Sequence, residues 1–377
     1  MDFSLDDDLI MIRDSVDRFV GDAYGFEARR ALIDSDEGFS RDNWRRFAEL
    51  GWPGATMPDE FGGIGMGPRA AMVIMGALGK GLVVEPYLAT IIMGAGMIAR
   101  HGSQAQKQDI LPQVTAGGMM LTLAHAEPGA RYDLHSIATT ARPTAGGYVL
   151  NGAKGMVLNA ASADKIIIPA RSSGDRTDRA GISLFLVDGD ASGLNRRDYK
   201  TYDGWCASEL ELADVSVPST GLIGEIDQGL EALEDIMDRA TAALCAEAVG
   251  AMEVLFEATL EYLKTRKQFG RAIGEFQALQ HRMSDMYMSL ENARSMAFAA
   301  TIALEDDDPA RRREEIAMAK VQINHSAHLI GREGAQMHGA IAITDELPAG
   351  HYYKHLSAIE ALFGNTEHHL GRLAAMA

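Results

Sequence analysis

The residues from Thr265 to His281 bring cationic, aromatic, amide and glycine groups together in one short segment, TRKQFGRAIGEFQALQH. Arg266 carries a planar, permanently charged guanidinium that can bind a phosphate through paired hydrogen bonds. Phe269 offers an apolar face, and Gly270 lets a ligand approach the backbone closely because it has no side chain. The segment predicts either a clamp for the phosphates of a dinucleotide or an exposed loop whose cations cap the neighbouring helices.

A second chemical candidate is a carboxylate within a helix. Glu247 is the one carboxylate in the apolar run from Ala240 to Met252. A glutamate in such a run is seldom fully buried unless it is paired or functional. Glu247 is therefore a candidate catalytic base, and the alternatives are a solvated stripe of the helix or a pair with a neighbouring helix.

Composition excludes several other functions. The chain has 377 residues and a net charge of −18, so it is a poor general binder of nucleic acid, which needs clustered Lys and Arg. Its two cysteines, Cys206 and Cys245, have no metal-ligand spacing, and they predict free thiols, no metal site and a reducing cytoplasm. The apolar stretch from Tyr87 to Ala99 is too short and too interrupted by glycine to span a bilayer, so no membrane association is expected.

Periodicity changes twice along the chain. Helical spacing covers the N-terminal part, including 41–50 and an apolar stretch that continues to about Arg100. Short β-type runs at 148–150, 165–168 and 182–187 follow, separated by turn residues. Helical patterns return at 230–264, 275–304 and 314–334, with a break at Asp306–Pro309. The pattern predicts an α+β fold with segregated units at 1–117, 118–225 and 226–377.

An ordered set of motifs gives the family. The segment from Arg266 to Gln277 follows R-x-Q-F-G-x-x-I-x-x-F-Q, and the chain resembles the acyl-CoA dehydrogenase family, in which this is a signature. Further landmarks fall in the family order: LGWPG at 50–54, PDEFGGIG at 58–65, AEPGA at 126–130, LNGAK at 150–154, VSVP at 215–218 and QMHG at 336–339. The resemblance implies an N-terminal helical domain, a middle antiparallel β-domain and a C-terminal four-helix bundle.

The resemblance also implies a reaction. Family members oxidise an acyl-CoA thioester to the 2-enoyl-CoA with FAD, and pass the electrons to an electron-transfer flavoprotein or an equivalent acceptor. A carboxylate removes the α-proton while the flavin takes the β-hydrogen as hydride. Members commonly carry this base in a C-terminal Tyr-Glu-Gly-Thr, where this chain has Phe363, which cannot remove a proton; Glu367 lies past the glycine.

A second family location for the base is the helix that begins the C-terminal bundle. The base known in some relatives falls near Ala240, and Glu247 is two turns further along, on the same face. The run CAEAVG at 245–250 resembles a subgroup that acts on steroid side-chain CoA thioesters. The resemblance therefore makes Glu247 the predicted base, with Glu127 in the flavin loop as the second candidate carboxylate.

The flavin motifs are preserved unevenly. Ala126 stands where the family has a Thr, Met156 replaces an aromatic residue beside the isoalloxazine ring, and Leu158 replaces a hydroxyl residue. The residues that serve the adenosine-diphosphate half of a neighbouring subunit's flavin are all present: Arg266, Gln268, Phe269, Gln336 and Gly339.

This asymmetry predicts an oligomer, either of identical chains or an α2β2 tetramer with a second acyl-CoA dehydrogenase subunit that holds the flavin ring. Two alternatives stay open. One is a non-catalytic structural subunit of such a heteromer, and the other is a relative with oxygenase or nitroalkane-oxidase chemistry, which would need a complete flavin pocket.

Overall fold

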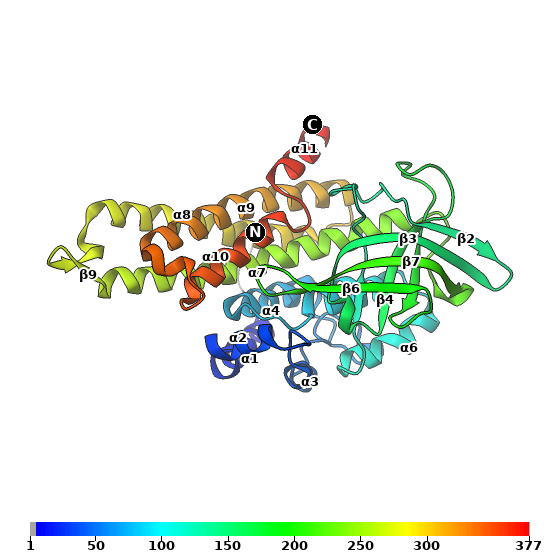
Figure 1. Ribbon diagram of the computed structural model, residues 1–377, viewed down its shortest axis with the longest axis horizontal. Coiled ribbons are helices and arrows are strands. Elements are labelled where there is room, and N and C mark those ends of the chain that lie inside the picture. The colour runs from blue at the N-terminus through cyan, green and yellow to red at the C-terminus, as the bar shows by residue number, and fades with distance from the viewer. Residues whose placement is uncertain (1–4, 377) are drawn as a thin grey trace. The chain divides into compact units, whose positions relative to one another are not determined.

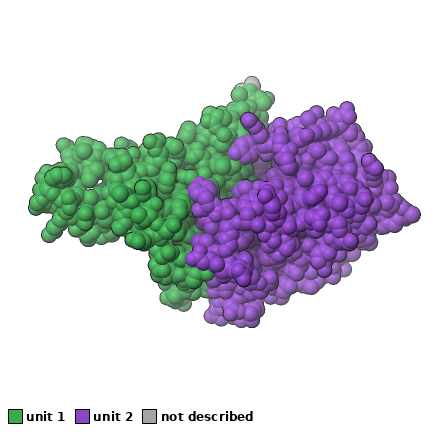
Figure 2. All heavy atoms as spheres, viewed as in Figure 1, with its two compact units in different colours: residues 1–31, 68–83, 241–377 green, residues 32–67, 84–240 purple. Residues whose placement is uncertain are grey.

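The computed structural model describes residues 5–376. The chain forms two compact units, coloured separately in Figure 2. Unit 1 comprises Met1–Ala31, Pro68–Val83 and Thr241–Ala377, and unit 2 comprises Leu32–Gly67 and Val84–Ala240. Each unit therefore combines segments that are distant in the sequence, and the predicted domain boundaries at 117 and 225 stay a prediction.

Helices fill the N-terminal part of the chain, as predicted. They are α1 (Asp7–Ala23), α2 (Phe26–Asp34), α3 (Arg41–Glu49), η1 (Asp59–Phe61), α4 (Gly67–Gly81), η2 (Leu88–Ala95), α5 (Gly96–His101) and α6 (Gln104–Thr115). Asp6 caps the start of α1, because its side chain accepts a hydrogen bond from the backbone N–H of Leu9 at 2.9 Å. The apolar helical stretch predicted to reach Arg100 is interrupted after α4, where Leu82 adopts a left-handed φ of 49°.

The middle of the chain forms one eight-stranded sheet (Figure 1). The strands are β1 (Leu121–Leu123), β2 (Thr140–Thr144), β3 (Gly147–Leu158), β4 (Lys165–Arg171), β5 (Ile182–Asp188), β6 (Leu194–Lys200), β7 (Cys206–Pro218) and β8 (Leu222–Ile223). Their order is β6-β7-β3-β2-β4-β5-β8, with β1 paired to β4. The predicted antiparallel pairing is confirmed except that β4 pairs in parallel with β1 and β2.

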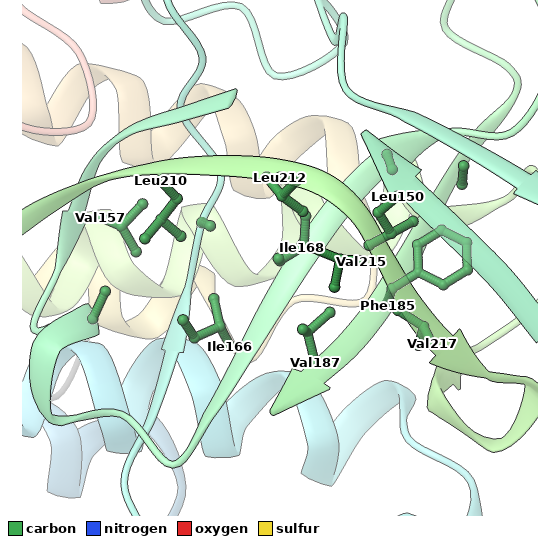
Figure 3. Packing of buried hydrophobic residues seen from close by; sticks show 14 of the residues in the cluster. Leu150, Val157, Ile166, Ile168, Phe185, Val187, Leu210, Leu212, Val215 and Val217 are labelled. Atoms are coloured by element: carbon green, nitrogen blue, oxygen red, sulfur yellow. The ribbon is translucent and has the colours of Figure 1, made fainter. Parts of the chain in front are cut away.

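The core of this sheet follows the two-residue period of its strands. Ile166 and Ile168 of β4 are fully buried, and Leu210 and Leu212 of β7 lie with them in one cluster of buried residues. Figure 3 shows these side chains together with Phe185 of β5. Because alternate residues of a strand face the same side, the Val/Ile/Leu pattern of the sequence places one face of the sheet in the core.

The C-terminal part is helical again. After α7 (Gly229–Thr265) come the hairpin strands β9 (Lys267–Gln268) and β10 (Arg271–Ala272), the turn η5 (Ile273–Glu275), α8 (Gln277–Ala303), α9 (Pro309–His338), η6 (Gly339–Ile343), α10 (Pro348–Ala361) and α11 (Thr366–Met376). The break at Asp306–Pro309 is confirmed, but α9 begins at Pro309, more than a turn before the predicted start. Asp308 caps the helix by accepting a hydrogen bond from Ala310 at 2.9 Å, and proline suits the first helical position.

Contacts between α7, α8, α9 and α10 form the predicted four-helix bundle. The rings of Phe256 on α7 and Tyr287 on α8 are 5.9 Å apart. Ser289 on α8 and Ser326 on α9 are hydrogen-bonded at 2.9 Å. Figure 1 shows these long helices running side by side.

Within residues 5–376, no helix has both the length and the apolar character that crossing a lipid bilayer would require.

Candidate active site

The predicted base lies inside the helical unit. Glu247 sits in the middle of α7 and is 2% exposed, so the solvated-stripe alternative is wrong. Its Oε1 atom is 3.0 Å from Nε2 of His355, which lies on α10 and is 1% exposed. The predicted alternative of a pair with a neighbouring helix is therefore realised in the structure, and the paired group is an imidazole. A buried carboxylate bonded to an imidazole can both accept a proton and be held in one orientation.

Helix α4 packs directly against the backbone at Glu247. A Cβ atom on Gly79 would lie 2.1 Å from the Glu247 carbonyl oxygen, and a Cβ on Gly250 would lie 1.9 Å from the Gly76 carbonyl oxygen. Real Cβ atoms do not approach so closely, so glycine is required on both helices for them to come this near. The close packing fixes the backbone from which the Glu247 side chain projects.

Phe363 occupies the turn where the family commonly has its base. The turn joins α10 to α11, and Phe363 adopts a left-handed φ of 59°. Nε2 of His369 is 3.1 Å from the Phe363 carbonyl oxygen. Glu367 lies in the first turn of α11 and is exposed. The structure therefore does not bring Glu367 into the place of the missing glutamate.

A buried lysine supports the same end of α10. Lys320 on α9 is fully buried, and its Nζ donates hydrogen bonds to Asn324 Oδ1 at 2.7 Å and to the Ile359 carbonyl oxygen at 2.6 Å. Burial lowers the pKa of Lys320 to about 8. Asn324 in turn donates to the Gly364 carbonyl oxygen at 3.5 Å. The sequence analysis did not identify Lys320 or His355. The local signal for Lys320 was its place in the apolar run AMAK at 317–320.

Three of the predicted flavin residues lie together in unit 2. The backbone N–H of Gly155 donates to the Ala126 carbonyl oxygen at 3.0 Å, which sets the loop at 126 beside the strand that carries Met156 and Leu158. Met156 has a left-handed φ of 49° and is 41% exposed, whereas Leu158 is buried. The side chains at these positions are apolar.

A buried ion pair holds the loop that contains Ala126 against strand β3. Glu127 Oε1 and Lys154 Nζ are 2.7 Å apart, and both side chains are almost fully buried. Glu127 also accepts backbone hydrogen bonds from Ala138 at 2.6 Å and Thr139 at 3.1 Å. Burial alone would raise the pKa of Glu127, but the charge and hydrogen bonds of its partners lower the pKa below its usual value. Since all its partners hold the loop in place, Glu127 is a structural carboxylate here.

The residues predicted to bind the adenosine-diphosphate half of FAD lie at one end of unit 1. The rings of Tyr262 near the end of α7 and His338 at the end of α9 are 4.6 Å apart. This contact brings the exposed hairpin residues 266–269 to the same end of the bundle as the exposed residues 336 and 339. Phe269 is 91% exposed.

These residues fit one half of FAD better than the other. Arg266 supplies an exposed guanidinium, and a Cβ on Gly270 or Gly339 would meet no atom within 4 Å, so a phosphate has room to approach the backbone. Around Ala126 and Leu158, by contrast, the side chains at the two positions where the family has hydroxyl groups supply no hydrogen-bonding group. The positions predicted for the diphosphate half therefore carry a cationic side chain, whereas Ala126 and Leu158 carry apolar ones.

The helical N-terminal part, the middle sheet and the C-terminal helical bundle are the arrangement that the acyl-CoA dehydrogenase resemblance implies. Three family models match the chain: the N-terminal domain of acyl-CoA dehydrogenase over residues 6–118, the middle domain over 122–215 and the C-terminal domain over 227–377. The chain belongs to the acyl-CoA dehydrogenase family. It is an FAD-dependent oxidoreductase that acts in acyl-CoA dehydrogenation.

Individual relatives show which branches are similar. L-prolyl-[peptidyl-carrier protein] dehydrogenase of Serratia sp. is 32% identical over 92% of this chain and 90% of its own length. The solved Tcur3481-Tcur3483 steroid ACAD variant is 29% identical, with a TM-score of 0.89 over 98% of this chain and 97% of that chain. The FAD complex of PigA is 30% identical, with a TM-score of 0.91 over 100% of this chain and 98% of that chain.

Proposed function

We propose that Glu247 is the general base of this enzyme and that its acyl substrate is bulky or branched, of the steroid side-chain type. One observation carries the proposal of the base: the usual site of the catalytic glutamate holds a phenylalanine, and a buried glutamate lies on α7 instead. Phe363 holds the turn between α10 and α11, whereas Glu247 is buried on α7 with a hydrogen-bonded imidazole beside it. A water-poor setting strengthens the electrostatic interactions of a base with its substrate.

The residues of this chain then have a defined part in the reaction. The α C–H bond of the thioester breaks, and its proton passes to the Glu247 carboxylate, which becomes a neutral acid. A bound FAD would supply the acceptor for the β-hydrogen and its electron pair, which the formation of the carbon–carbon double bond requires. Burial of Glu247 in α7 keeps bulk water from competing for the proton.

Glu247→Gln tests this assignment, because it preserves size and removes the base. We expect flavin content to be unchanged and the bleaching of flavin absorbance by acyl-CoA under anaerobic conditions to be lost. Glu257→Gln is the matched control, since Glu257 is an exposed carboxylate on the same helix. Bleaching at the normal rate by Glu247→Gln would refute the assignment.

The acyl group is proposed from the CAEAVG run at 245–250 and from the similarity to a solved steroid ACAD. Steroid side-chain, isovaleryl, butyryl and octanoyl CoA thioesters can be compared by their rates of anaerobic flavin reduction. A prolyl thioester on a carrier protein belongs in the same series, because one relative is named for that substrate. Fastest reduction by a short straight-chain or a carrier-bound thioester would overturn the proposed acyl class.

We further propose an α2β2 tetramer, in which a second acyl-CoA dehydrogenase subunit holds the isoalloxazine ring. Exposed Arg266, Gln268 and Phe269 support a contribution to the flavin of another subunit, and the apolar side chains of Ala126 and Leu158 support weak ring binding by this chain. Purification of the chain alone is the test. A fully flavinated homo-oligomer that bleaches with substrate would refute the heteromer.

The electron acceptor is proposed to be an electron-transfer flavoprotein in the cytoplasm, a setting supported by the free thiols of Cys206 and Cys245. Rapid reoxidation of the reduced flavin by such an acceptor and slow reoxidation by oxygen are expected. Rapid reoxidation by oxygen would instead favour the oxygenase alternative.

A structural subunit is the second candidate function, favoured by Phe363 in place of the usual base. In a reconstituted heteromer, full activity of the Glu247→Gln variant would support it.

A further inference from the structure

We infer that His355 is the positioning residue of Glu247: its imidazole holds the carboxylate in the orientation that removes the α-proton. The inference rests on the proposed role of Glu247. The two residues are separated by 108 positions, and their side chains meet between α7 and α10 at 3.0 Å. Both are buried, so water competes little for the hydrogen bond and the bond is correspondingly strong.

Helix α10 does not depend on this hydrogen bond for its place in unit 1. Three residues before His355, the hydroxyl of Tyr352 donates a hydrogen bond to the Lys80 carbonyl oxygen on α4. One turn after it, the Ile359 carbonyl oxygen accepts from Lys320 on α9 at 2.6 Å. His351 is 3.3 Å from Arg29 on α2. Because α10 contacts three other helices through these groups, the His355 hydrogen bond is not needed to hold α10 in place.

The orientation of the Glu247 side chain is a separate matter from the position of its backbone. Packing of Gly79 against the Glu247 carbonyl fixes the main chain, but a glutamate side chain still rotates about three bonds. A hydrogen bond from Nε2–H to Oε1 selects one of these rotamers and sets the direction in which the carboxylate faces. Removal of a group that orients a metal-bound ligand costs about 10- to 100-fold, and we expect a loss of similar size for His355.

The hydrogen bond from His355 Nε2 to Glu247 Oε1 can be tested with variants that keep or remove a donor at the Nε2 position. The amide nitrogen of glutamine can reach the position of histidine Nε2, whereas that of asparagine reaches only the position of Nδ1. We therefore expect His355→Gln to keep most of the rate of anaerobic flavin reduction, and His355→Asn and His355→Leu to lose about 10- to 100-fold. Because orientation affects the chemical step, the substrate concentration for half-maximal reduction should change little.

His351→Gln is the matched control, since His351 lies one turn away on α10 and its ring contacts Phe26 and Arg29. Its rate should equal that of the unmodified enzyme. The variants are compared in the flavin-loaded enzyme, with the partner subunit co-expressed if flavin loading requires it, and thermal unfolding confirms that each is folded.

A second readout needs no flavin. The imidazole ¹⁵N resonances of His355 report whether Nε2 carries a hydrogen that is bonded to a carboxylate. We expect the Nε2 resonance to shift in Glu247→Gln and to remain unchanged in Glu257→Gln.

The outcomes separate the inference from the proposed function. Loss of flavin reduction in Glu247→Gln with normal rates in both His355→Asn and His355→Leu would overturn the positioning role and leave the base assignment standing. Normal reduction in Glu247→Gln would overturn the base assignment itself. Equal losses in His355→Gln and His355→Leu, with normal unfolding temperatures, would also contradict the positioning role, because the restored donor would then have no effect.

Discussion

Gly79 of α4 packs against the carbonyl oxygen of Glu247 so closely that a Cβ atom at Gly79 would lie 2.1 Å from that oxygen. The contact joins two helices of unit 1 whose sequences are far apart. It places a rigid surface directly behind the proposed base. The main-chain position of the proposed base is thus controlled by a residue that has no side chain.

Gly79→Ala should therefore displace α4 from α7. Inserting a methyl group into a packed contact destabilises by about 1–3 kcal/mol, and the displaced backbone of Glu247 should also slow flavin reduction. Gly21→Ala is the matched control, because Gly21 is also helical and a Cβ there meets no atom within 4 Å. It should be neutral or stabilising by up to about 1 kcal/mol. Urea unfolding of the two variants gives the comparison, and equal stabilities would contradict the close packing.

The Glu127–Lys154 pair should respond asymmetrically to substitution. Lys154→Met leaves the Glu127 carboxylate buried without its cation, and removal of one partner from a buried ion pair costs about 3–5 kcal/mol. The double variant Glu127→Gln/Lys154→Met should recover part of this loss. Unfolding free energies of the single and double variants form the test, and strictly additive losses would contradict a direct pairing.

The same pair predicts a dependence on acid. The pKa of Glu127 is lowered in the folded protein, because hydrogen bonds and the charge of Lys154 outweigh the effect of burial. A lowered pKa stabilises the fold above the pKa of the unfolded chain, and this stabilisation is lost as the pH falls through the folded pKa. Glu127→Gln should therefore be less sensitive to acid than the unmodified protein when unfolding is followed from neutral pH downwards. An identical acid dependence would show that the carboxylate does not carry this effect.

Lys320 should give a pH dependence of the same sign as Glu127, but in the alkaline range. Burial lowers its pKa to about 8, from an ordinary value of 10.5. Between these values the unfolded chain binds the proton more strongly, so stability should rise with pH from about 8 towards 10.5. In Lys320→Met this rise should disappear. Urea unfolding at a series of alkaline pH values measures it, and the same slope in both proteins would exclude the assignment.

Arg266 offers a test of the diphosphate clamp. Arg266→Lys keeps the charge but loses the fork that binds a phosphate through two hydrogen bonds, so flavin content should fall. Arg271→Lys is the control, because the Arg271 guanidinium lies 4.2 Å from the centre of the Phe276 ring in the same hairpin region. The ratio of flavin to protein absorbance measures the effect. Equal flavin content in the two variants would argue against the clamp.

The sequence alone determined the family, the order of helical and β segments, and the approximate limits of the helices at 41–49, 229–265 and 277–303. These features depend on motifs and on periodicities of two or 3.6 residues, which are local properties of the chain. The break at Asp306–Pro309 and the strands at 165–171 and 182–188 were predictable for this reason. Glu247 was also visible, as a carboxylate in an apolar run.

Only the tertiary structure decided what lies beside that carboxylate. Nothing near Glu247 in the sequence points to His355, to Gly79 or to the ring contact between Tyr262 and His338. Each of these contacts depends on how far one helix lies along another, which is set by loops and close packing over the whole unit. The sequence determined which groups could carry out the chemistry, and the packing of the helices determined which of those groups meet.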